Sequence, residues 1–558
     1  MNRRSFLLTS GMAAGAVSAR AESGNARLPE ILRAPEAVSV YTEKQRVPLK
    51  RTGARWTGGA IEVVTEPRTS PQGAELSVTL AAPHDAVLRI GMRWNGPVPA
   101  SWKFLGDHWE RSYGDLEWRG IVPYRLMPWY FLASDGRTTQ GCGVKTGCAS
   151  VACWQVDSAG FTLWLDVANG GAGVGLGERK LEAATVVVHT SAAGESPLAT
   201  ARALCRRMCE KPRLPSSPVY GGNNWYYTYG NNLSAEALLR DSDLMAELAP
   251  SGPNRPFMVL DMGWEPSSEG AGPTEHGNAG FPDMPGMVAQ IKKRGVRPGV
   301  WIRPLLSVAT LPESWLLRGQ QAGGGVKPPF VVLDPSVPEA LAYVERRVHG
   351  LSAWGFDLIK HDYSTFDITG RWGFQMGPEL TSAGWHFADR SKTTAEIVSG
   401  LYKAIRRGAG SAQLIGCNTI GHLGAGLFEM QRIGDDTSGH EWPRTRKMGV
   451  NTLAFRLAQH KTFFAADADC VAVTKDVPWE LTRQWLDLVT RSATPLFVSA
   501  DPAAVGKRER DALKVAFALA SRPLQGLEPA DWLTTTVPEH WRSAGGEMTD
   551  YRWYNDEV

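Results

Sequence analysis

Residues 338–362, PEALAYVERRVHGLSAWGFDLIKHD, carry the pattern that decides the fold of this chain. The first part, Pro338 to Ser352, repeats its apolar side chains at helical spacing, and the second part, 355–362, is a compact apolar run that ends in charged residues. The same alternation of short apolar runs and amphipathic segments continues over about 300 residues. It predicts a parallel sheet that is wrapped by helices.

Eight candidate strands occur in this part of the chain, at 219–225, 256–261, 297–303, 355–362, 412–418, 428–433, 462–467 and 494–499. The predicted helices between them include Ala235 to Leu248, Met287 to Arg294, Pro338 to Ser352, Thr393 to Arg407 and Glu480 to Arg491. Eight strand-then-helix units match the size of a (β/α)₈ TIM barrel, which we assign to 218–525. A doubly wound open sheet is the structural alternative, although no glycine-rich phosphate loop follows any of these strands.

The regions on either side of the predicted barrel have different sequence patterns. From 28 to 195, short alternating runs such as 76–80 (LSVTL) and 161–165 (FTLWL) are separated by turn residues, which predicts a β-sandwich domain. Residues 196–217 are predicted as a helical linker, and 526–558 as a short C-terminal β-like tail. The predicted fold class is therefore multidomain α and β, with an N-terminal β-sandwich followed by a (β/α)₈ TIM barrel.

The chain begins with the pattern of an export signal over 1–21. Paired arginines, Arg3 and Arg4, precede Ser-Phe-Leu, an uncharged stretch runs to Ser18, and an Ala-Arg-Ala cleavage site ends at Ala21. This resembles a twin-arginine signal, which implies a bacterial protein that is periplasmic or secreted. The alternative is an uncleaved tail. Beyond this segment no window approaches 18 consecutive apolar residues, so no membrane span is predicted.

The composition excludes several classes of protein. The chain has 558 residues, 43% hydrophobic and 21% charged, which is typical of a folded multidomain protein. Arg3, Arg4 and Arg20 account for the whole net charge of +3, so the rest of the chain offers no basic surface for nucleic acid or an anionic membrane. The 21 Trp residues outnumber the 17 Phe residues, and indole rings serve either a core or a sugar platform.

Acidic residues gather at the ends of four predicted strands, where barrel enzymes place their functional side chains. These strand ends are LDMGW (260–264), IKHDY (359–363), RIGDD (432–436) and DAD (467–469). Aspartates with few histidines form a poor site for a borderline metal ion. Two facing carboxylates instead suit glycoside hydrolysis, in which one attacks the anomeric carbon and the other protonates the leaving oxygen.

Seven motifs occur in the order found in melibiase-type α-galactosidases, namely GNNW (222–225), LDMGW (260–264), GVW (299–301), IKHD (359–362), Arg432 with Asp436, DAD (467–469) and PLFVS (495–499). The chain resembles this clan of retaining glycoside hydrolases over 218–525, and its N-terminal β domain is similar to the one that precedes the barrel in the larger branch. The resemblance implies a covalent glycosyl–Asp intermediate and no metal or organic cofactor.

The resemblance also assigns two catalytic carboxylates. Asp362 takes the place of the nucleophile, although a strand-end Asp is alternatively a helix cap. Lys360, two residues earlier, points to the same side of the strand and is expected to keep Asp362 ionised. Asp436 takes the place of the acid/base, with a pKa expected to be raised relative to that of Asp362. Asp435 is the rival, and because neighbours in a strand face opposite ways, only one of the two is expected to face the substrate.

Further positions that match or neighbour the family motifs are expected to bind the sugar, and these are Asp261, Lys360, Arg432, Asp469, Trp225, Trp264, Arg303 and Asn418. The two tryptophans are stacking platforms or, equally, plugs of the barrel mouth. Met262 replaces the second acid of a family Asp–Asp pair, so the resemblance does not extend to galactose specificity. Arg303 stands where the larger branch has an acidic residue, which opens the site to an anionic substituent. The loop 370–391 is expected to build a leaving-group subsite or a subunit contact.

The sequence thus predicts a retaining, exo-acting, α-galactosidase-like glycosidase that acts on an oligosaccharide or glycoside. A transglycosylase uses the same intermediate and remains an alternative. A catalytically silent carbohydrate-binding protein on a glycosidase scaffold is the alternative from another class, and retention of both predicted catalytic aspartates argues against it. A metal-dependent barrel hydrolase is disfavoured by the types of side chain at the strand ends.

Overall fold

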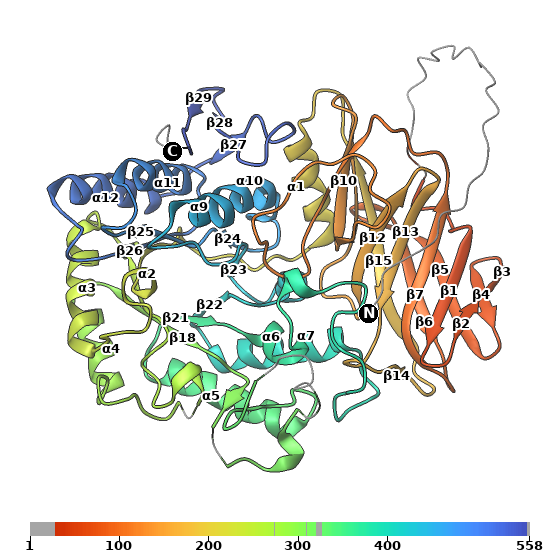
Figure 1. The fold of residues 1–558 in the computed structure, drawn as a ribbon, viewed down its shortest axis with the longest axis horizontal. Helices are drawn as coiled ribbons and strands as arrows, with labels where there is room; N and C mark the ends of the chain where they lie inside the picture. The colour runs from red at the N-terminus through yellow and green to blue at the C-terminus, as the bar shows by residue number, and fades with distance from the viewer. Residues whose placement is uncertain are drawn as a thin grey trace, which may run out of the picture.

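The computed structural model describes residues 28, 30–272, 274–308, 310–317, 319 and 326–554. The predicted export signal, 1–21, lies outside these residues. Figure 1 shows a β-rich body from the N-terminal third of the chain beside a larger body of strands and helices. Within the described ranges, no helix is both long and apolar enough to span a membrane.

The N-terminal body consists of two antiparallel sheets. One sheet has the order β2 (Arg46–Pro48), β1 (Ala37–Thr42), β7 (Ala86–Asn95), β13 (Gly160–Asp166), β12 (Val151–Asp157) and β9 (Met127–Pro128), with β14 (Val174–Gly175) paired to β7. The other has the order β3 (Lys50–Thr52), β4 (Arg55–Gly58), β5 (Ile61–Ser70), β6 (Gly73–Ala81), β15 (Leu181–Thr190), β11 (Thr139–Val144), β10 (Tyr130–Ser134) and β8 (Lys103–Gly106). Phe131 of β10 lies edge-on to Trp154 of β12, with ring centroids 5.4 Å apart, so the core lies between the sheets. This is the predicted β-sandwich.

Helix α1 (Pro197–Met208) connects the sandwich to the rest of the chain and packs on β11 and β15. It begins at Ser196, whose side chain accepts a hydrogen bond from the backbone N–H of Ala199. Glycines of β11 allow the close approach, since a Cβ atom at Gly141 would lie 2.8 Å from Leu204. The predicted linker is therefore packed against the sandwich.

The larger body is built on a curled sheet in which every ladder is parallel. Its order is β24 (Ala465–Asp467), β23 (Met430–Arg432), β22 (Gln413–Gly416), β21 (Leu358–His361), β18 (Arg297–Ile302), β17 (Phe257–Leu260), β16 (Tyr220–Asn223), β26 (Leu496–Ala500) and β25 (Cys470–Val473). The two end strands of this order, β24 and β25, are separated in the chain only by Ala468 and Asp469. The ends of the sheet are thereby brought together, and each predicted strand overlaps an observed one.

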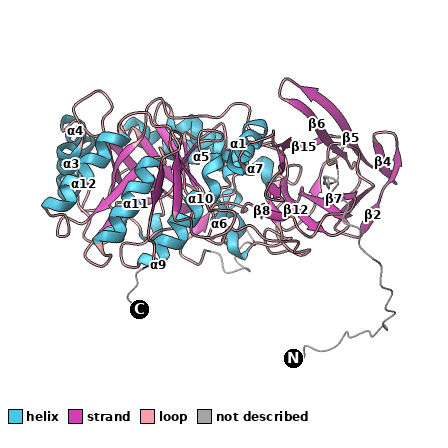
Figure 2. Ribbon diagram, turned by 90° about the horizontal axis from the view of Figure 1, so that it is seen from above, coloured by secondary structure: helices cyan, strands magenta, loops and turns pink. Residues whose placement is uncertain are grey.

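Helices surround this sheet, as Figure 2 shows. The longer ones are α3 (Ala235–Leu248), α4 (Met284–Lys293), α5 (Pro338–Ala353), α7 (Thr394–Ala409), α11 (Trp479–Arg491) and α12 (Lys507–Ala520). Short helices are α2 (Trp225–Thr228), α6 (Ser364–Thr369), α8 (Gly421–Gly424), α9 (Trp442–Thr445) and α10 (Thr452–Arg456). A small hairpin pairs β19 (Leu306–Ser307) with β20 (Val331–Val332), and the C-terminal sheet is β27 (Leu527–Pro529), β28 (His540–Ser543) and β29 (Met548–Asp550). The five predicted helices correspond to α3, α4, α5, α7 and α11.

Residues 107–116, here called the arm, leave the sandwich after β8 and dock on the larger body. Asp107 forms an ion pair of 2.7 Å with Arg456, and both side chains are almost completely buried. Ser112 pairs with the chain after β23: its N–H donates to the carbonyl of Ile433, and its own carbonyl accepts from the N–H of Asp435, each at 2.8 Å. The arm therefore pairs with the chain just beyond β23, at one of the strand ends that were predicted to carry function.

Candidate active site

Charged side chains from three strands meet at the C-terminal edge of the parallel sheet. Lys360 belongs to β21 and Asp362 directly follows it, Asp261 directly follows β17, and Arg432 ends β23. The Nζ atom of Lys360 donates to Oδ2 of Asp261 at 2.7 Å, and the same oxygen accepts from Nδ2 of Asn223 at 2.6 Å. The carboxyl ends of parallel strands lie at one edge, which is why these distant residues come together.

Asp362 accepts hydrogen bonds on both carboxylate oxygens. Oδ1 accepts from the backbone N–H groups of Tyr363 and Asn418 at 2.7 and 2.9 Å, and Oδ2 accepts from Nε1 of Trp301 at 3.2 Å. Burial raises the pKa of Asp362, but nearby positive charge, that of Arg111 first, and the two N–H groups outweigh it, so the pKa lies below its ordinary value. Asp362 is therefore ionised at neutral pH.

Asp436 follows β23 and has a side chain that is 40% exposed. Its Oδ1 accepts from Nη2 of Arg432 at 2.9 Å and lies 3.7 Å from Nη1 of Arg111. Burial raises the pKa of Asp436, but the two guanidinium groups outweigh it, and the pKa is lowered. Both aspartates therefore have pKa values below the ordinary value of an Asp carboxyl group, and the order of the two pKa values stays a prediction.

Asp435 lies beside Asp436 but has different partners. Its Oδ1 is 2.7 Å from Nη2 of Arg111, and its Oδ2 is 3.0 Å from Nη2 of Arg444. The two aspartates share Arg111 because both lie beyond the end of β23, where strand alternation no longer applies. Strand alternation therefore does not decide between them, and which of the two faces the substrate stays a prediction. What separates them is the exposed fraction of the side chain, 15% for Asp435 against 40% for Asp436.

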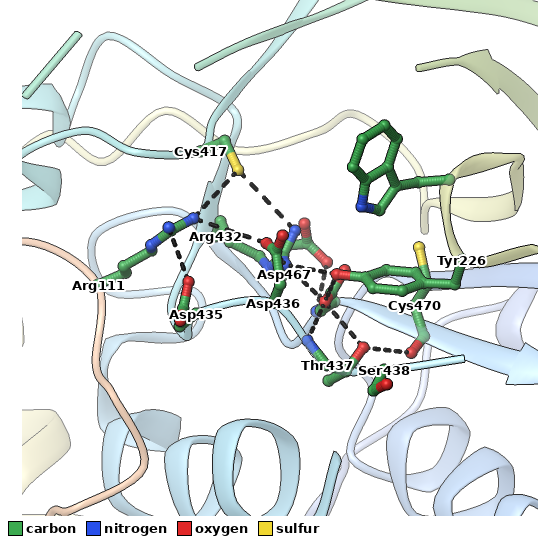
Figure 3. A network of polar contacts seen from close by, with 12 residues as sticks. Arg111, Tyr226, Cys417, Arg432, Asp435, Asp436, Thr437, Ser438, Asp467 and Cys470 are labelled. Atoms are coloured by element: carbon green, nitrogen blue, oxygen red, sulfur yellow. Dashed lines mark hydrogen bonds and ion pairs between the residues drawn. The ribbon is translucent and has the colours of Figure 1, made fainter. Parts of the chain in front are cut away.

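Arg111 is a member of this site that the sequence analysis missed. It comes from the arm of the N-terminal body, and its side chain is 6% exposed. Figure 3 shows it reaching Asp435 and Cys417 from the side opposite Tyr226. No local pattern around position 111 distinguishes this arginine from the other arginines of the chain, so only the docking of the arm identifies it.

Arg432 and Asp469 form a second buried ion pair of 2.5 Å. The Oδ2 atom of Asp469 also accepts from the backbone N–H and the hydroxyl of Thr437, each at 2.8 Å, and from the hydroxyl of Tyr226. Figure 3 shows Tyr226, Arg432 and Thr437, the partners of Asp469, close to one another beside Asp436. Because this oxygen is fully engaged, Asp469 holds Arg432 and the residue that follows Asp436 in place.

Trp264 and Asn418 were predicted to contact the sugar, and the structure places both side chains elsewhere. Trp264 is fully buried and donates from Nε1 to the carbonyl of Trp301 at 3.0 Å, so it belongs to the core. The side-chain oxygen of Asn418 accepts from the N–H of Phe366 at 2.9 Å, and its amide donates to Glu110 of the arm. Only the backbone N–H of Asn418 serves the site, through Asp362.

Arg303 does not present a free cation. Its guanidinium forms hydrogen bonds to both oxygens of Asp367, with Nη2 2.7 Å from Oδ1, and both side chains are buried. It also lies over the ring of Tyr363, 4.1 Å from the centroid. Since its charge is compensated, the structure gives no support to an anionic substituent at this position.

Two partly exposed tryptophans, Trp225 and Trp372, follow strands of the parallel sheet on the side of the candidate site. Trp225 is half-buried, with its ring centroid 5.7 Å from that of Tyr229. Trp372, from the loop 370–391, lies 5.4 Å from the guanidinium carbon of Arg111 and 5.5 Å from the ring of Tyr363. Rings in this position suit the apolar faces of sugars. Trp225 therefore remains a candidate platform, and Trp372 joins it.

No cluster of three or more potential metal ligands occurs among the residues that the structure describes. A cavity of about 710 Å³ lies between the sandwich and the larger body, lined for example by Thr185, Pro338 and Glu396. It shares none of the residues of the site described above. The site itself can perform carboxylate chemistry, because Asp362 and Asp436 lie at the same edge of the sheet, and Asp436 contacts Arg432 and Arg111.

The fold matches those of solved α-galactosidases. The enzyme from Thermus thermophilus, in complex with p-nitrophenyl α-D-galactopyranoside, aligns with a TM-score of 0.61 and 18% identity over 92% of this chain and 99% of that chain. GH36 α-galactosidase AgaA from Geobacillus stearothermophilus, in complex with raffinose, aligns with a TM-score of 0.56 and 14% identity over 88% of this chain and 75% of that chain. The α-galactosidase from Lactobacillus brevis gives 0.54 and 14% over 90% and 74%.

No protein-family profile and no curated protein matches the sequence. At identities of 14 to 18%, the structural likeness defines a class of fold, that of the GH36 α-galactosidases. This agrees with the resemblance found in the sequence motifs. Fold alone does not assign a reaction, which must be argued from the side chains of the site.

Proposed function

We propose that this protein is a retaining, exo-acting α-glycosidase on a closed (β/α)₈ barrel, which hydrolyses the terminal sugar of an oligosaccharide or glycoside. The observation that carries the proposal is the pair Asp362 and Asp436. They follow β21 and β23, each carries a pKa lowered by Arg111, and the charge of Asp362 acts on Asp436. Two carboxyl groups at one edge of a parallel sheet are the pair of groups that glycoside hydrolysis requires.

The first step joins the sugar to the enzyme. The ionised carboxylate of Asp362 attacks the anomeric carbon and forms a C–O bond, while the bond to the leaving oxygen breaks and that oxygen takes the proton of the Asp436 carboxyl group. In the second step the Asp436 carboxylate removes a proton from water, whose oxygen attacks the same carbon and releases Asp362. Two displacements retain the anomeric configuration.

The ionisation of Asp436 sets the pH range of this reaction. Burial, which raises its pKa, is outweighed by Arg432 and Arg111, so the protonated form needed in the first step is abundant only in acid. We therefore expect hydrolysis to be fastest at acidic pH. On the sugar side, the charge of Lys360 is compensated by Asp261 and that of Arg303 by Asp367, which favours a neutral terminal sugar.

Two further proposals follow from the sequence. The first is that the segment 1–21 directs export through the twin-arginine route. The mass of the exported protein tests this proposal, because it shows whether the mature chain begins after Ala21. The solved relatives in fold are described with p-nitrophenyl α-D-galactopyranoside, stachyose and raffinose, so α-galactosides come first among the substrates to be tested. Because Met262 replaces an acid of the family motif, the panel must also include other neutral sugars.

The test is a panel of aryl α-galactosides, β-L-arabinopyranosides, α-N-acetylgalactosaminides and uronic-acid analogues, with the product anomer followed by NMR. We expect cleavage of a neutral member with net retention, and loss of cleavage in Asp362→Ala with unchanged circular dichroism. Net inversion would overturn the retaining assignment. Sugar binding without any cleavage would favour the carbohydrate-binding alternative. Product analysis in the presence of added sugar measures the share of transfer to a sugar hydroxyl, the transglycosylase alternative.

A further inference from the structure

We propose that Arg111, supplied by the N-terminal sandwich, is a positioning residue of the reaction that holds the acid/base carboxylate, so that the active site is complete only when the arm is docked. This inference rests on the proposed function for its kinetic readout. It also has a readout that needs no substrate.

The guanidinium group of Arg111 contacts both neighbouring aspartates, Asp435 and Asp436. One nitrogen, Nη2, lies 2.7 Å from Asp435, and the other, Nη1, lies 3.7 Å from Asp436 and 3.9 Å from the sulfur of Cys417. The planar guanidinium fork can contact two neighbouring carboxylates at once, which a single ammonium on a flexible stem cannot do with the same geometry. The side chain of Asp436 is therefore held from two sides, by Arg111 and by Arg432.

The arm gives Arg111 little freedom to leave. The neighbouring Glu110 is buried and accepts from the amide of Asn418 and, at 2.8 Å, from the N–H of Gly373. A Cβ atom at Gly114 would lie 2.2 Å from the carbonyl oxygen of Lys447, so the backbone itself is in close contact at this point. The arm therefore links the sandwich to Asn418, which lies just beyond β22, and to Gly373 of the loop 370–391.

The groups that face Asp436 come from several elements. Charged or titratable side chains around it are Arg111, Lys360, Asp362, Arg432, Tyr226, Tyr229 and Tyr363. Those around Arg111 are Asp362, Asp435, Asp436, Tyr113, Tyr363 and Cys417, with Glu110 beside it. Among the cations of the site described here, Arg111 is the one that the N-terminal body contributes.

Arg444 offers a matched control. It also binds Asp435, at 3.0 Å, but it belongs to α9 of the larger body, and its side chain is 39% exposed. If Arg111 only anchored Asp435, replacing either arginine would have the same effect. If Arg111 positions Asp436 and supplies its charge, only the replacement of Arg111 will change the ionisation of the site.

The experiment compares Arg111→Gln, Arg111→Lys and Arg444→Gln with the wild type in pH profiles of kcat/KM. Arg111 lowers the pKa of both Asp362 and Asp436, so Arg111→Gln should move both limbs of the profile up by about one pH unit and reduce kcat by about 100-fold. Arg111→Lys keeps the charge but not the fork, so its limbs should stay near those of the wild type with a reduced kcat. Arg444→Gln should leave the limbs in place. Equal profiles for Arg111→Gln and the wild type, or a shift of the same size in Arg444→Gln, would overturn the inference.

A second measurement separates this inference from the proposed function. Carboxylates with lowered pKa values stabilise the fold at neutral pH and lose that contribution as the pH falls through their folded-state values. The decrease in Tm between about pH 7 and about pH 3 should therefore be smaller in Arg111→Gln than in the wild type and in Arg444→Gln. This result stands even if the wild type cleaves no glycoside. Equal decreases in all three proteins would reject the role of Arg111, and if Arg111→Gln does not fold, Arg111→Lys decides by its kcat alone.

Discussion

The ammonium of Lys360 lies 2.7 Å from Oδ2 of Asp261, and this contact joins the ends of β21 and β17. The side chains are only 11% and 4% exposed. Lys360 was expected to serve Asp362, and its charge does lower the pKa of that residue, but its direct hydrogen-bond partner is Asp261. Lys360 and Asp261, which were both predicted to bind the sugar, therefore form an ion pair with each other.

Removal of one member of this pair should be costly. In Lys360→Met the buried carboxylate of Asp261 loses its counterion, and we expect a loss of about 3 to 5 kcal/mol in the free energy of unfolding. The double variant Lys360→Met with Asp261→Leu should recover most of this loss, because neither charge is left unpaired. Urea unfolding of the four proteins in the cycle measures the coupling. A double variant as unstable as the sum of the single ones would contradict the pairing.

Asp436 and Asp435 can be told apart by their response to leaving groups. Asp436→Ala should reduce kcat/KM by about 100- to 10,000-fold for substrates with poor leaving groups, with a much smaller effect on activated aryl glycosides, because the latter need little protonation. Added azide should restore turnover and yield a glycosyl azide. Asp435→Ala, the neighbouring control, should show neither signature. Azide rescue of Asp435→Ala alone would assign the acid/base to Asp435.

Two tryptophans of the predicted site should behave in opposite ways. Trp225 is half-buried and directly follows Asn223 and Asn224 at the end of β16, so Trp225→Ala should raise KM by about tenfold with little change in Tm, as expected for a lost stacking platform. Trp264 is fully buried, so Trp264→Ala should reduce the free energy of unfolding by about 3 to 5 kcal/mol. Thermal unfolding and initial rates measure both effects. A stable Trp264→Ala protein with a raised KM would instead indicate that Trp264 contacts the sugar.

His361 should make the protein sensitive to acid. It is fully buried between Lys360 and Asp362, neither ring nitrogen has a hydrogen-bond partner among the described residues, and burial lowers its pKa to about 3. The unfolded chain binds this proton near its ordinary pKa, so the contribution of His361 to stability falls as the pH decreases from about 6.5 to about 3. At about pH 5 the loss is about 2 kcal/mol.

The replacement His361→Phe tests this account, because Phe keeps a ring against Phe428, whose centroid is 4.6 Å away. The variant should be more stable than the wild type by about 1 kcal/mol at neutral pH, since no buried polar group is left without a partner. Its advantage should grow at about pH 5. Urea unfolding at both pH values measures the difference, and an equal advantage at the two values would show that His361 does not titrate as described.

Much of the architecture was predictable from local patterns. The apolar run 355–362 became β21, and the amphipathic segment before it became α5, because side-chain periodicity is set within a few residues. The strand-end aspartates then met at one edge, as parallel strands require. The structure departs from the prediction at the seventh strand, 462–467. This strand is observed as β24, and after a break at Asp469, which has a positive φ of 74°, the chain forms a further strand, β25.

The chemistry of the site depended on contacts that no local pattern contains. Arg111 and Cys417 are 306 positions apart, and only the docking of the arm brings that guanidinium to the predicted catalytic carboxylates. The same docking lowers the pKa of Asp436, and tertiary packing hides Trp264 and engages Asn418 and Arg303 in other bonds. The amino-acid pattern thus determined which groups stand at the strand ends, because periodicity is local. Their ionisation and exposure were decided by the folded structure, because electric fields and burial depend on every element packed around them.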